Sequence, residues 1–245
     1  MKLISFPGDA QFPTHSPFCL KAMCLLEMAK VDWQPEMVQD FEALPLGKVP
    51  VARVGDALIP DSHNIQAYLE SNGADFMPGL SRVKKAASHA LIRTVEESLR
   101  LGLVHDRWLN DECWAVMKEI FFAAVPEPMR EQAAEEARGH VRTGLMSEGI
   151  ARFSPEDRQA RFDNDLEVID ATLNGQQFLF GDTPTAADAA VAPVLDMILT
   201  LPVATDLRKA TEARTALAPY VARVREAIYP DASKVMQDFM SVAAE

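Results

Sequence analysis

The residues best suited to chemistry are Ser16 and Cys19, which stand three positions apart after a short apolar segment. Ser16 is followed by Pro17, and a serine followed by a proline is typical of a helix start. The free N–H groups and the dipole of a first helical turn favour a thiolate, whether it belongs to the protein or to a ligand. Taken alone, the motif indicates a structural helix cap more strongly than a reactive site.

A second feature is Val49-Pro50, which stands just before a predicted strand, where proline cannot donate to the ladder. A cis peptide bond there would turn the backbone groups of Val49 toward the helix that follows Ser16. An extended peptide could then pair with those groups as an extra strand. The alternative is an ordinary trans proline at the start of a strand, which is far more common for an isolated proline.

A third feature is the pair Asp61 and Ser62 at the predicted start of another helix. A helix N-terminus with a hydroxyl group binds a carboxylate, and a neighbouring aspartate binds an ammonium group. Together the two residues suit the zwitterionic head of an α-amino acid. Simple capping of the helix by the same residues is the alternative.

The elements that would position these residues alternate between strand and helix. The apolar pattern predicts a strand at 2–6, a loop at 7–15, a helix at 17–30 and a strand at 33–38. Strands at 51–54 and 57–59 flank Gly55-Asp56, and a helix runs from Asp61 or Ser62 to about residue 71, where Asn72-Gly73 ends it. The order is strand, helix, strand, an optional helix, two strands and a helix. If the first two strands pair in parallel and the last two form a hairpin, this order is the thioredoxin arrangement.

The rest of the chain reads as helical. Residues 74–80 predict a linker, and helical periodicity follows at 81–104, 109–124, 127–151, 155–174, 185–200 and 206–228. Thr185 and Asp188 form a capping box ahead of an apolar run. We therefore expect an α/β thioredoxin-like N-terminal domain at 1–73 and an all-α helical-bundle C-terminal domain at 81–245.

The composition excludes several classes of function. The net charge is −12. Residues 1–80 contain five basic and ten acidic side chains, and residues 81–245 contain nineteen basic and twenty-six acidic side chains. Neither part therefore has the basic surface of a nucleic-acid binder. The five histidines are scattered and none is grouped with cysteines, so we expect no metal site.

The same sequence indicates a cytoplasmic protein. Its three unevenly placed cysteines argue against a disulfide framework and for a reducing compartment. No apolar run is long enough to span a bilayer, and the N-terminus lacks a secretory signal pattern. The C-terminal residues 237–245 are short and polar, so we expect no anchor there and no membrane partner.

Taken jointly, these residues resemble the glutathione transferase superfamily over essentially the whole chain. The resemblance rests on Ser-x-x-Cys at the first helix, Val-Pro before the third strand, Asp-Ser eleven residues later, and Phe-Leu-Phe-Gly-Asp-x-Pro-Thr-x-Ala-Asp at 178–188. Within the superfamily, Ser-Pro-Phe-Cys-Leu-Lys, the Asp-Ser pair and Arg107-Trp108 are most similar to the failed-axon-connections and metaxin-like branch.

The resemblance implies a glutathione site and a role for each residue. Ser16 would touch the glutathione sulfur, and its hydrogen bond would lower the thiol pKa by roughly one to two units. The thiolate would then attack a hydrophobic electrophile. Val49, before the cis proline Pro50, would pair with the cysteinyl backbone, while Asp61 and Ser62 would hold the γ-glutamyl group. The family also implies a homodimer that serves detoxification.

Other residues and other functions stay open. Lys48 is either the partner of the glycine carboxylate or a solvated surface lysine. His15 could polarise the ligand or simply face solvent. The metaxin-like branch includes assembly factors, so a non-catalytic scaffold is the main alternative. A reductase or peroxidase that uses Cys19 is a third, although Ser-Pro-Phe-Cys lacks the first cysteine of the similar glutaredoxin motif Cys-Pro-Tyr-Cys.

Overall fold

A computed structural model describes residues 1–242 of the chain, which form two compact units. The sheet unit comprises residues 1–89, 176–193 and those from 220 on, and the helical unit comprises residues 90–175 and 194–219. The predicted fold class is confirmed, because a small mixed sheet with flanking helices is joined to a helical C-terminal part. The domain boundaries at 1–73 and 81–245, with a linker at 74–80, stay a prediction.

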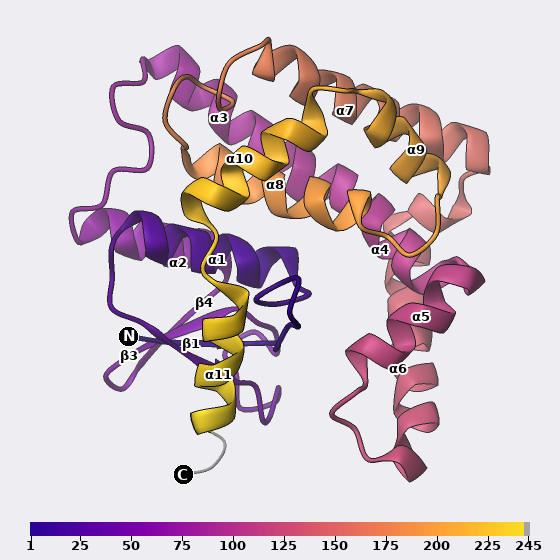
Figure 1. Cartoon of the computed structure of the whole chain (residues 1–245). Coiled ribbons are helices and arrows are strands. Elements are labelled where there is room, and N and C mark those ends of the chain that lie inside the picture. The colour runs from indigo at the N-terminus through magenta and orange to yellow at the C-terminus, as the bar shows by residue number, and fades with distance from the viewer. Residues whose placement is uncertain (243–245) are drawn as a thin grey trace. The chain divides into compact units, whose positions relative to one another are not determined.

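The sheet has four strands in the order β2-β1-β3-β4, as Figure 1 shows. They are β1 (Lys2–Ser5), β2 (Gln34–Met37), β3 (Val51–Val54) and β4 (Ala57–Pro60). As expected, β1 and β2 are parallel, whereas β3 is antiparallel to both β1 and β4. Gly55 makes the turn between β3 and β4. Its φ is +57°, a value that a residue with a side chain rarely adopts.

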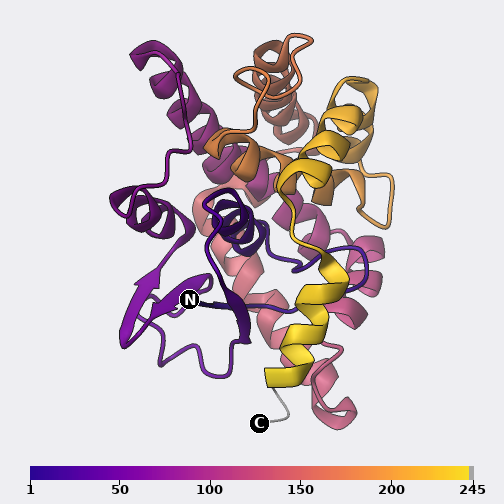
Figure 2. The same cartoon turned by 60° about the vertical axis from the view of Figure 1, so that its left-hand side comes forward.

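Two helices of the sheet unit pack together on one face of the sheet (Figures 1 and 2). Helix α1 (Pro17–Met28) buries every side chain from Cys19 to Leu26, and α2 (Ser62–Ser71) ends at Asn72, just before Gly73 with a φ of +100°. Both helices follow the predicted ranges closely. Their starts carry the residues that the sequence singles out for chemistry.

Two features of the sheet unit differ from the prediction. The optional helix between β2 and β3 does not form, because Pro45 and Gly47 interrupt the segment, which instead consists of turns anchored by buried Leu44. A further helix, α11 (Ala232–Val242), was not predicted. It packs against β2, an edge strand, and buries Val235 and Phe239, one turn apart.

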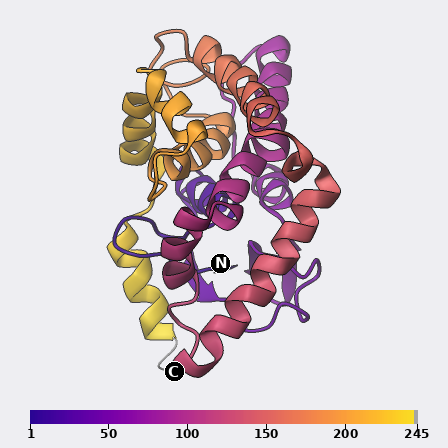
Figure 3. The same cartoon turned by 90° about the vertical axis from the view of Figure 1, so that its right-hand side faces the viewer.

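The remaining helices follow the predicted segments with local changes. They are α3 (Arg82–Thr94), α4 (Arg100–Leu109), α5 (Asp111–Phe121), α6 (Glu127–Glu148), α7 (Pro155–Leu173), α8 (Ala186–Leu199), α9 (Asp206–Ala213) and α10 (Leu217–Ile228). A π-helical turn, Val95–Leu99, links α3 to α4, and a 3₁₀ turn, Ile150–Arg152, follows α6. Figure 3 shows α6, the pink helix of 22 residues. None of the helices described in residues 1–242 has the length and the hydropathy that crossing a bilayer requires.

The single helix predicted at 206–228 is two helices, α9 and α10. Pro219 explains the break, because it stands in the first turn of α10, where its missing N–H costs nothing. In a continuous helix its ring would clash with the carbonyl group of Thr215, four residues earlier. The turn between the helices is closed by the N–H of Leu217, which donates to the Arg214 carbonyl oxygen at 2.9 Å.

The packing of α4 yields a first prediction at Gly102. A Cβ atom added there would lie 2.8 Å from Leu207 Cδ2 and 2.8 Å from Phe162 Cε2, and both of these side chains are buried. We expect Gly102→Ala to lower the free energy of unfolding by about 1–2 kcal/mol, because overpacking outweighs the better helix propensity of alanine. Urea unfolding followed by circular dichroism measures the change.

Gly139→Ala in α6 is the matched control for that substitution. Nothing lies within 4 Å of a Cβ atom added at Gly139, which is exposed. This variant should be more stable than the unmodified protein by about 0.5–1 kcal/mol, since alanine loses less backbone entropy than glycine. If both variants gain stability alike, α4 is not packed as closely as described.

Candidate functional site

Ser16 is the N-cap of α1, as predicted. The N–H of Cys19 donates to Ser16 Oγ at 3.3 Å, and the N–H of Ser16 donates to Thr14 Oγ1 at 3.3 Å. Ser16 is half-buried. The Ser16 side chain also forms a hydrogen bond with the Cys19 side chain. Because a protonated thiol can be the donor in that contact and the Ser16 Oγ accepts in the cap, the hydroxyl proton can be directed to a ligand. Capping and activation of a ligand are therefore compatible in this residue.

The loop before Ser16 is folded tightly onto itself. The N–H of Asp9 donates to the Phe12 carbonyl oxygen at 2.8 Å, and a Cβ atom on Gly8 would lie 1.9 Å from that same oxygen. His15 Nε2 lies 3.4 Å from Asp9 Oδ2, and its ring packs near Phe12, which the guanidinium group of Arg225 covers at 4.7 Å. His15 is thus held by Asp9, a contact for which the sequence gives no separate signal.

Cys19 lies below Ser16 in the core of the sheet unit. Its side chain is fully buried, and burial raises the pKa of its thiol to about 11. Hydrogen bonds with the Ser16 side chain, the Phe6 backbone and Thr14 lower the pKa, but less than burial raises it. Cys19 therefore carries a proton at neutral pH and supports the helix start as an apolar group.

The peptide bond between Val49 and Pro50 is cis, as the family resemblance implies. Val49 is half-buried against a small apolar cluster, Pro50 is buried and Lys48 is exposed. The N–H of Asp61 donates to the Pro50 carbonyl oxygen at 3.0 Å. The residues before β3 and the residues after β4 are therefore in direct contact.

Asp61 and Ser62 begin α2 with an uncommon backbone. Asp61 has a φ of +76°, a conformation that costs a residue with a side chain about 1–3 kcal/mol, and such residues cluster at functional sites. Asp61 Oδ1 accepts the N–H of His63 at 2.8 Å, while the side chain stays exposed. Ser62 is only 2% exposed.

The register of the sheet brings these residues to one end of the sheet unit. Ile4 of β1 lies opposite Val51 of β3, so the end of β1 adjoins the segment before Val51. The backbone of Phe6, just after β1, contacts Cys19 in the first turn of α1. The start of α1, the cis proline and the start of α2 thus surround the same sheet end. Lys48 borders this group from the exposed segment that precedes β3.

This arrangement offers donors and acceptors for a small polar peptide. The Ser16 hydroxyl group at one helix start, the exposed Asp61 carboxylate and the buried Ser62 hydroxyl group at another, and the backbone beside a cis proline can each bind a different part of it. In the part of the chain that the structure describes, no three His, Cys, Asp or Glu side chains are grouped so as to hold a metal ion.

Relatives of known sequence match this chain over most of its length. Human metaxin-2 is 24% identical over 195 residues, which cover 78% of this chain and 73% of the relative. Failed axon connections from Drosophila melanogaster is 23% identical over 252 residues, which cover 94% of this chain and 58% of the relative. The chain therefore spans less than two thirds of the length of that second relative.

Solved structures share the fold over the whole chain. Poplar glutathione transferase F1 with a serine-to-cysteine mutation superposes with a TM-score of 0.60 and 17% identity over 98% of both chains. Glutathione transferase F2 from Populus trichocarpa superposes with a TM-score of 0.60 and 15% identity, over 98% of this chain and 99% of the other. At these identities the likeness establishes the fold.

The family models agree with the fold. Residues 17–113 match the glutathione S-transferase N-terminal domain, and residues 131–223 match the glutathione S-transferase C-terminal domain. The two matches follow one another in the order of that family and together cover most of the chain. The chain therefore belongs to the glutathione transferase superfamily, and its relatives there include metaxin-2 and failed axon connections.

Proposed function

We propose that this chain binds glutathione and activates its thiol group for attack on a small hydrophobic electrophile. The observation that carries the proposal is the half-buried Ser16 hydroxyl at the start of α1, which accepts the N–H of Cys19 and can still donate its proton. A thiol placed against this hydroxyl would sit at the positive end of the α1 dipole. Both effects favour the thiolate.

In the proposed reaction the thiol proton leaves to solvent. The hydrogen bond from Ser16 to the charged sulfur contributes about 1.5–3 kcal/mol, which lowers the thiol pKa by roughly one to two units. The sulfur lone pair then forms a bond to an electrophilic carbon, and the leaving group departs with its bonding electrons. Ser16 keeps its own proton throughout, so it acts by hydrogen bonding and not as a base.

The remaining site residues hold the peptide. The exposed Asp61 carboxylate receives the α-ammonium group of the γ-glutamyl residue, and the Ser62 hydroxyl donates to its carboxylate. The backbone of Val49 pairs with the cysteinyl residue, and Lys48 takes the glycine carboxylate. The small number of cysteines favours a reducing compartment, so we propose a cytoplasmic location, and the family resemblance favours a homodimer and a role in detoxification.

A non-catalytic scaffold is the second candidate. It is favoured by Asp61, whose side chain is one methylene shorter than the glutamate usual in the family and already accepts the N–H of His63 at 2.8 Å. A carboxylate engaged as a cap has less freedom to reach a γ-glutamyl ammonium group. In that case the fold serves protein contacts, and glutathione does not bind.

Isothermal titration with glutathione tests the two candidates. We expect saturable binding to the unmodified protein, and binding weaker by about tenfold or more in Asp61→Ala and in Ser62→Ala, because each loses a hydrogen bond to a charged group. Asp56→Ala is the control, since it removes an exposed carboxylate from the β3–β4 turn, away from the site. Absence of binding to the unmodified protein would favour the scaffold.

A further inference from the structure

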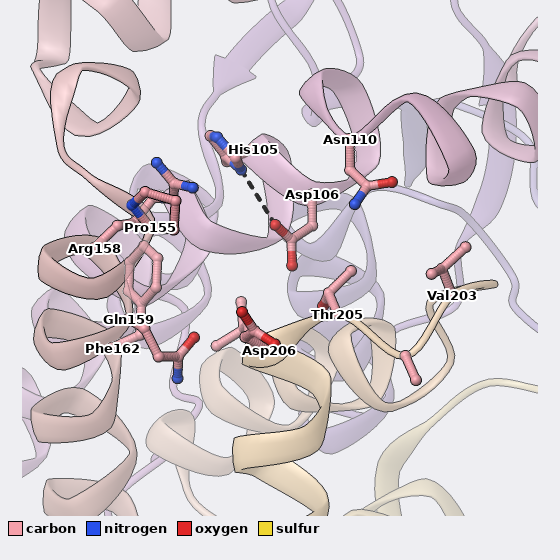
Figure 4. A pocket seen from close by; sticks show the side chains of 12 residues that line it. His105, Asp106, Asn110, Pro155, Arg158, Gln159, Phe162, Val203, Thr205 and Asp206 are labelled. Carbon is pink, nitrogen blue, oxygen red and sulfur yellow. Dashed lines mark hydrogen bonds and ion pairs between the residues drawn. The ribbon is translucent and has the colours of Figure 1, made fainter.

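The helical unit contains a cavity that the proposed function does not use. Its volume is about 270 Å³, and it lies where the end of α4, the start of α7 and the segment before α9 meet (Figure 4). At about 30 Å³ for each water molecule, this is room for a ligand of roughly nine non-hydrogen atoms. Its wall combines polar groups with apolar side chains.

The most distinctive group in the wall is the carboxylate of Asp106. Its Oδ1 lies 3.1 Å from His105 Nδ1, whereas its Oδ2 is buried and has no hydrogen-bond partner within residues 1–242. The side chain as a whole is 14% exposed, and Figure 4 shows it projecting from α4 into the space between Thr205 and Gln159. A buried carboxylate oxygen without a donor is costly, so a ligand that supplies one is favoured.

Other polar groups of the wall already have protein partners. Asn110 Oδ1 accepts the N–H of Cys113 at 3.0 Å, and Gln159 Nε2 donates to Asp163 Oδ1 at 3.2 Å. Arg158 donates to the Phe153 carbonyl oxygen at 3.1 Å. Asp106 forms no ion pair with Arg158 in the described structure. Its Oδ2 is therefore left to bind a donor from outside the protein.

The charge and the apolar wall together indicate the class of ligand. A cationic donor matches a buried carboxylate better than a neutral one, because charge-assisted hydrogen bonds are about twice as strong. Phe162 and Leu207, which are 2% and 3% exposed, offer an aliphatic chain a hydrophobic wall. We propose that this cavity binds a small aliphatic primary amine in its protonated form, whose ammonium group donates to Asp106 Oδ2 and whose carbon chain lies against Phe162 and Leu207.

Three probes of similar size test this assignment on the full, unmodified chain. Butylammonium, tetramethylammonium and butanol are titrated while amide resonances are followed by ¹H–¹⁵N NMR. Butylammonium should give saturable shifts at His105, Asp106 and Thr205. Tetramethylammonium has the charge without an N–H donor and butanol has a donor without the charge, so both should bind about tenfold or more weakly. Equal affinity for the three probes, or no saturable shift with butylammonium, would overturn the assignment.

Asp106→Asn tests the carboxylate itself, because the amide keeps the shape of the side chain and removes its charge. Butylammonium should bind about tenfold or more weakly to this variant. The control is Asp157→Asn on α7, which removes the same charge from an exposed side chain outside the cavity wall. This control variant should bind butylammonium as tightly as the unmodified protein does. Unchanged affinity in Asp106→Asn contradicts the proposal, and the probe series decides the matter if that variant does not fold.

Discussion

Replacement of Asp188 by alanine is expected to lower the free energy of unfolding by about 3–5 kcal/mol, the largest stability effect that we predict for one side chain. Asp188 is fully buried at the start of α8 in the sheet unit. Its Oδ1 accepts the Leu179 N–H at 3.0 Å and the Tyr220 hydroxyl at 3.0 Å. Its Oδ2 accepts the Thr185 N–H at 2.7 Å and the Thr185 hydroxyl at 2.9 Å.

The reason for so large an effect is that one carboxylate on α8 accepts hydrogen bonds from both the loop before α8 and helix α10. Burial raises the pKa of Asp188, and the hydrogen bonds from Leu179, Thr185 and Tyr220 act in the opposite direction and favour the charged form. With alanine in its place, the donors are left unsatisfied in the core. Each costs about 1–3 kcal/mol, and partial relaxation keeps the total below their sum.

Urea unfolding followed by circular dichroism measures the loss. Asp182→Ala is the matched control, because it removes an exposed carboxylate six residues earlier in the same segment and should change the free energy of unfolding by less than about 0.5 kcal/mol. Asp188→Asn should fall between the two, since an amide can accept at its oxygen but places an N–H₂ group against some of the donors. A loss below about 1 kcal/mol in Asp188→Ala would show that the network is not as described.

Asp188 also shows how far a sequence can be interpreted. Its position three residues after Thr185 predicts a capping box, and the structure confirms that local contact. The contact with Tyr220 joins residues 32 positions apart, and no local pattern predicts it. The same distinction holds across the fold. The hairpin at Gly55 was predictable from its turn residues. Helix α11 was not, because its two buried side chains are covered through its packing against β2, which is distant in the sequence.

For the site, the residue types were predictable and their geometry was not. The cap at Ser16 follows from its sequence context, whereas the contact between His15 and Asp9 depends on the folding of the whole preceding loop. The positive φ of Asp61 occurs where its N–H donates to the carbonyl oxygen of Pro50, eleven residues earlier, and no local pattern predicts it. The cavity beside Asp106 is formed by distant segments, so the sequence gives no sign of it.

Replacement of Ser16 by alanine is the prediction with the largest expected effect on activity, and it rests on the proposed function. At pH 7 the rate of glutathione conjugation, measured as kcat/KM with chlorodinitrobenzene, should fall by about 10- to 100-fold. The reason is that the bound thiol loses a hydrogen bond worth about 1.5–3 kcal/mol to its charged form. Ser16→Thr keeps a hydroxyl group at this position and should retain most of the rate.

The pH profile separates this role from a structural one. Because the hydroxyl lowers the thiol pKa, its removal raises that pKa, so the midpoint of the profile should move up by roughly one to two pH units. The variant should therefore lose most of its rate at low pH and recover toward that of the unmodified protein at high pH. A loss of rate that is equal at every pH would assign Ser16 a structural role only.

The chain contains its own control for the loss of the cap. Ser154 precedes Pro155 as Ser16 precedes Pro17, and the N–H of Asp157 donates to Ser154 Oγ at 3.1 Å, just as the N–H of Cys19 donates to Ser16 Oγ at 3.3 Å. Both alanine variants should lose about 0.5–2 kcal/mol of stability as a cap is removed. Only Ser16→Ala should also shift the pH profile, because only Ser16 is placed to donate to glutathione. If both variants lose the same rate, Ser16 acts as a helix cap and does not activate a thiol, and the scaffold becomes the better account.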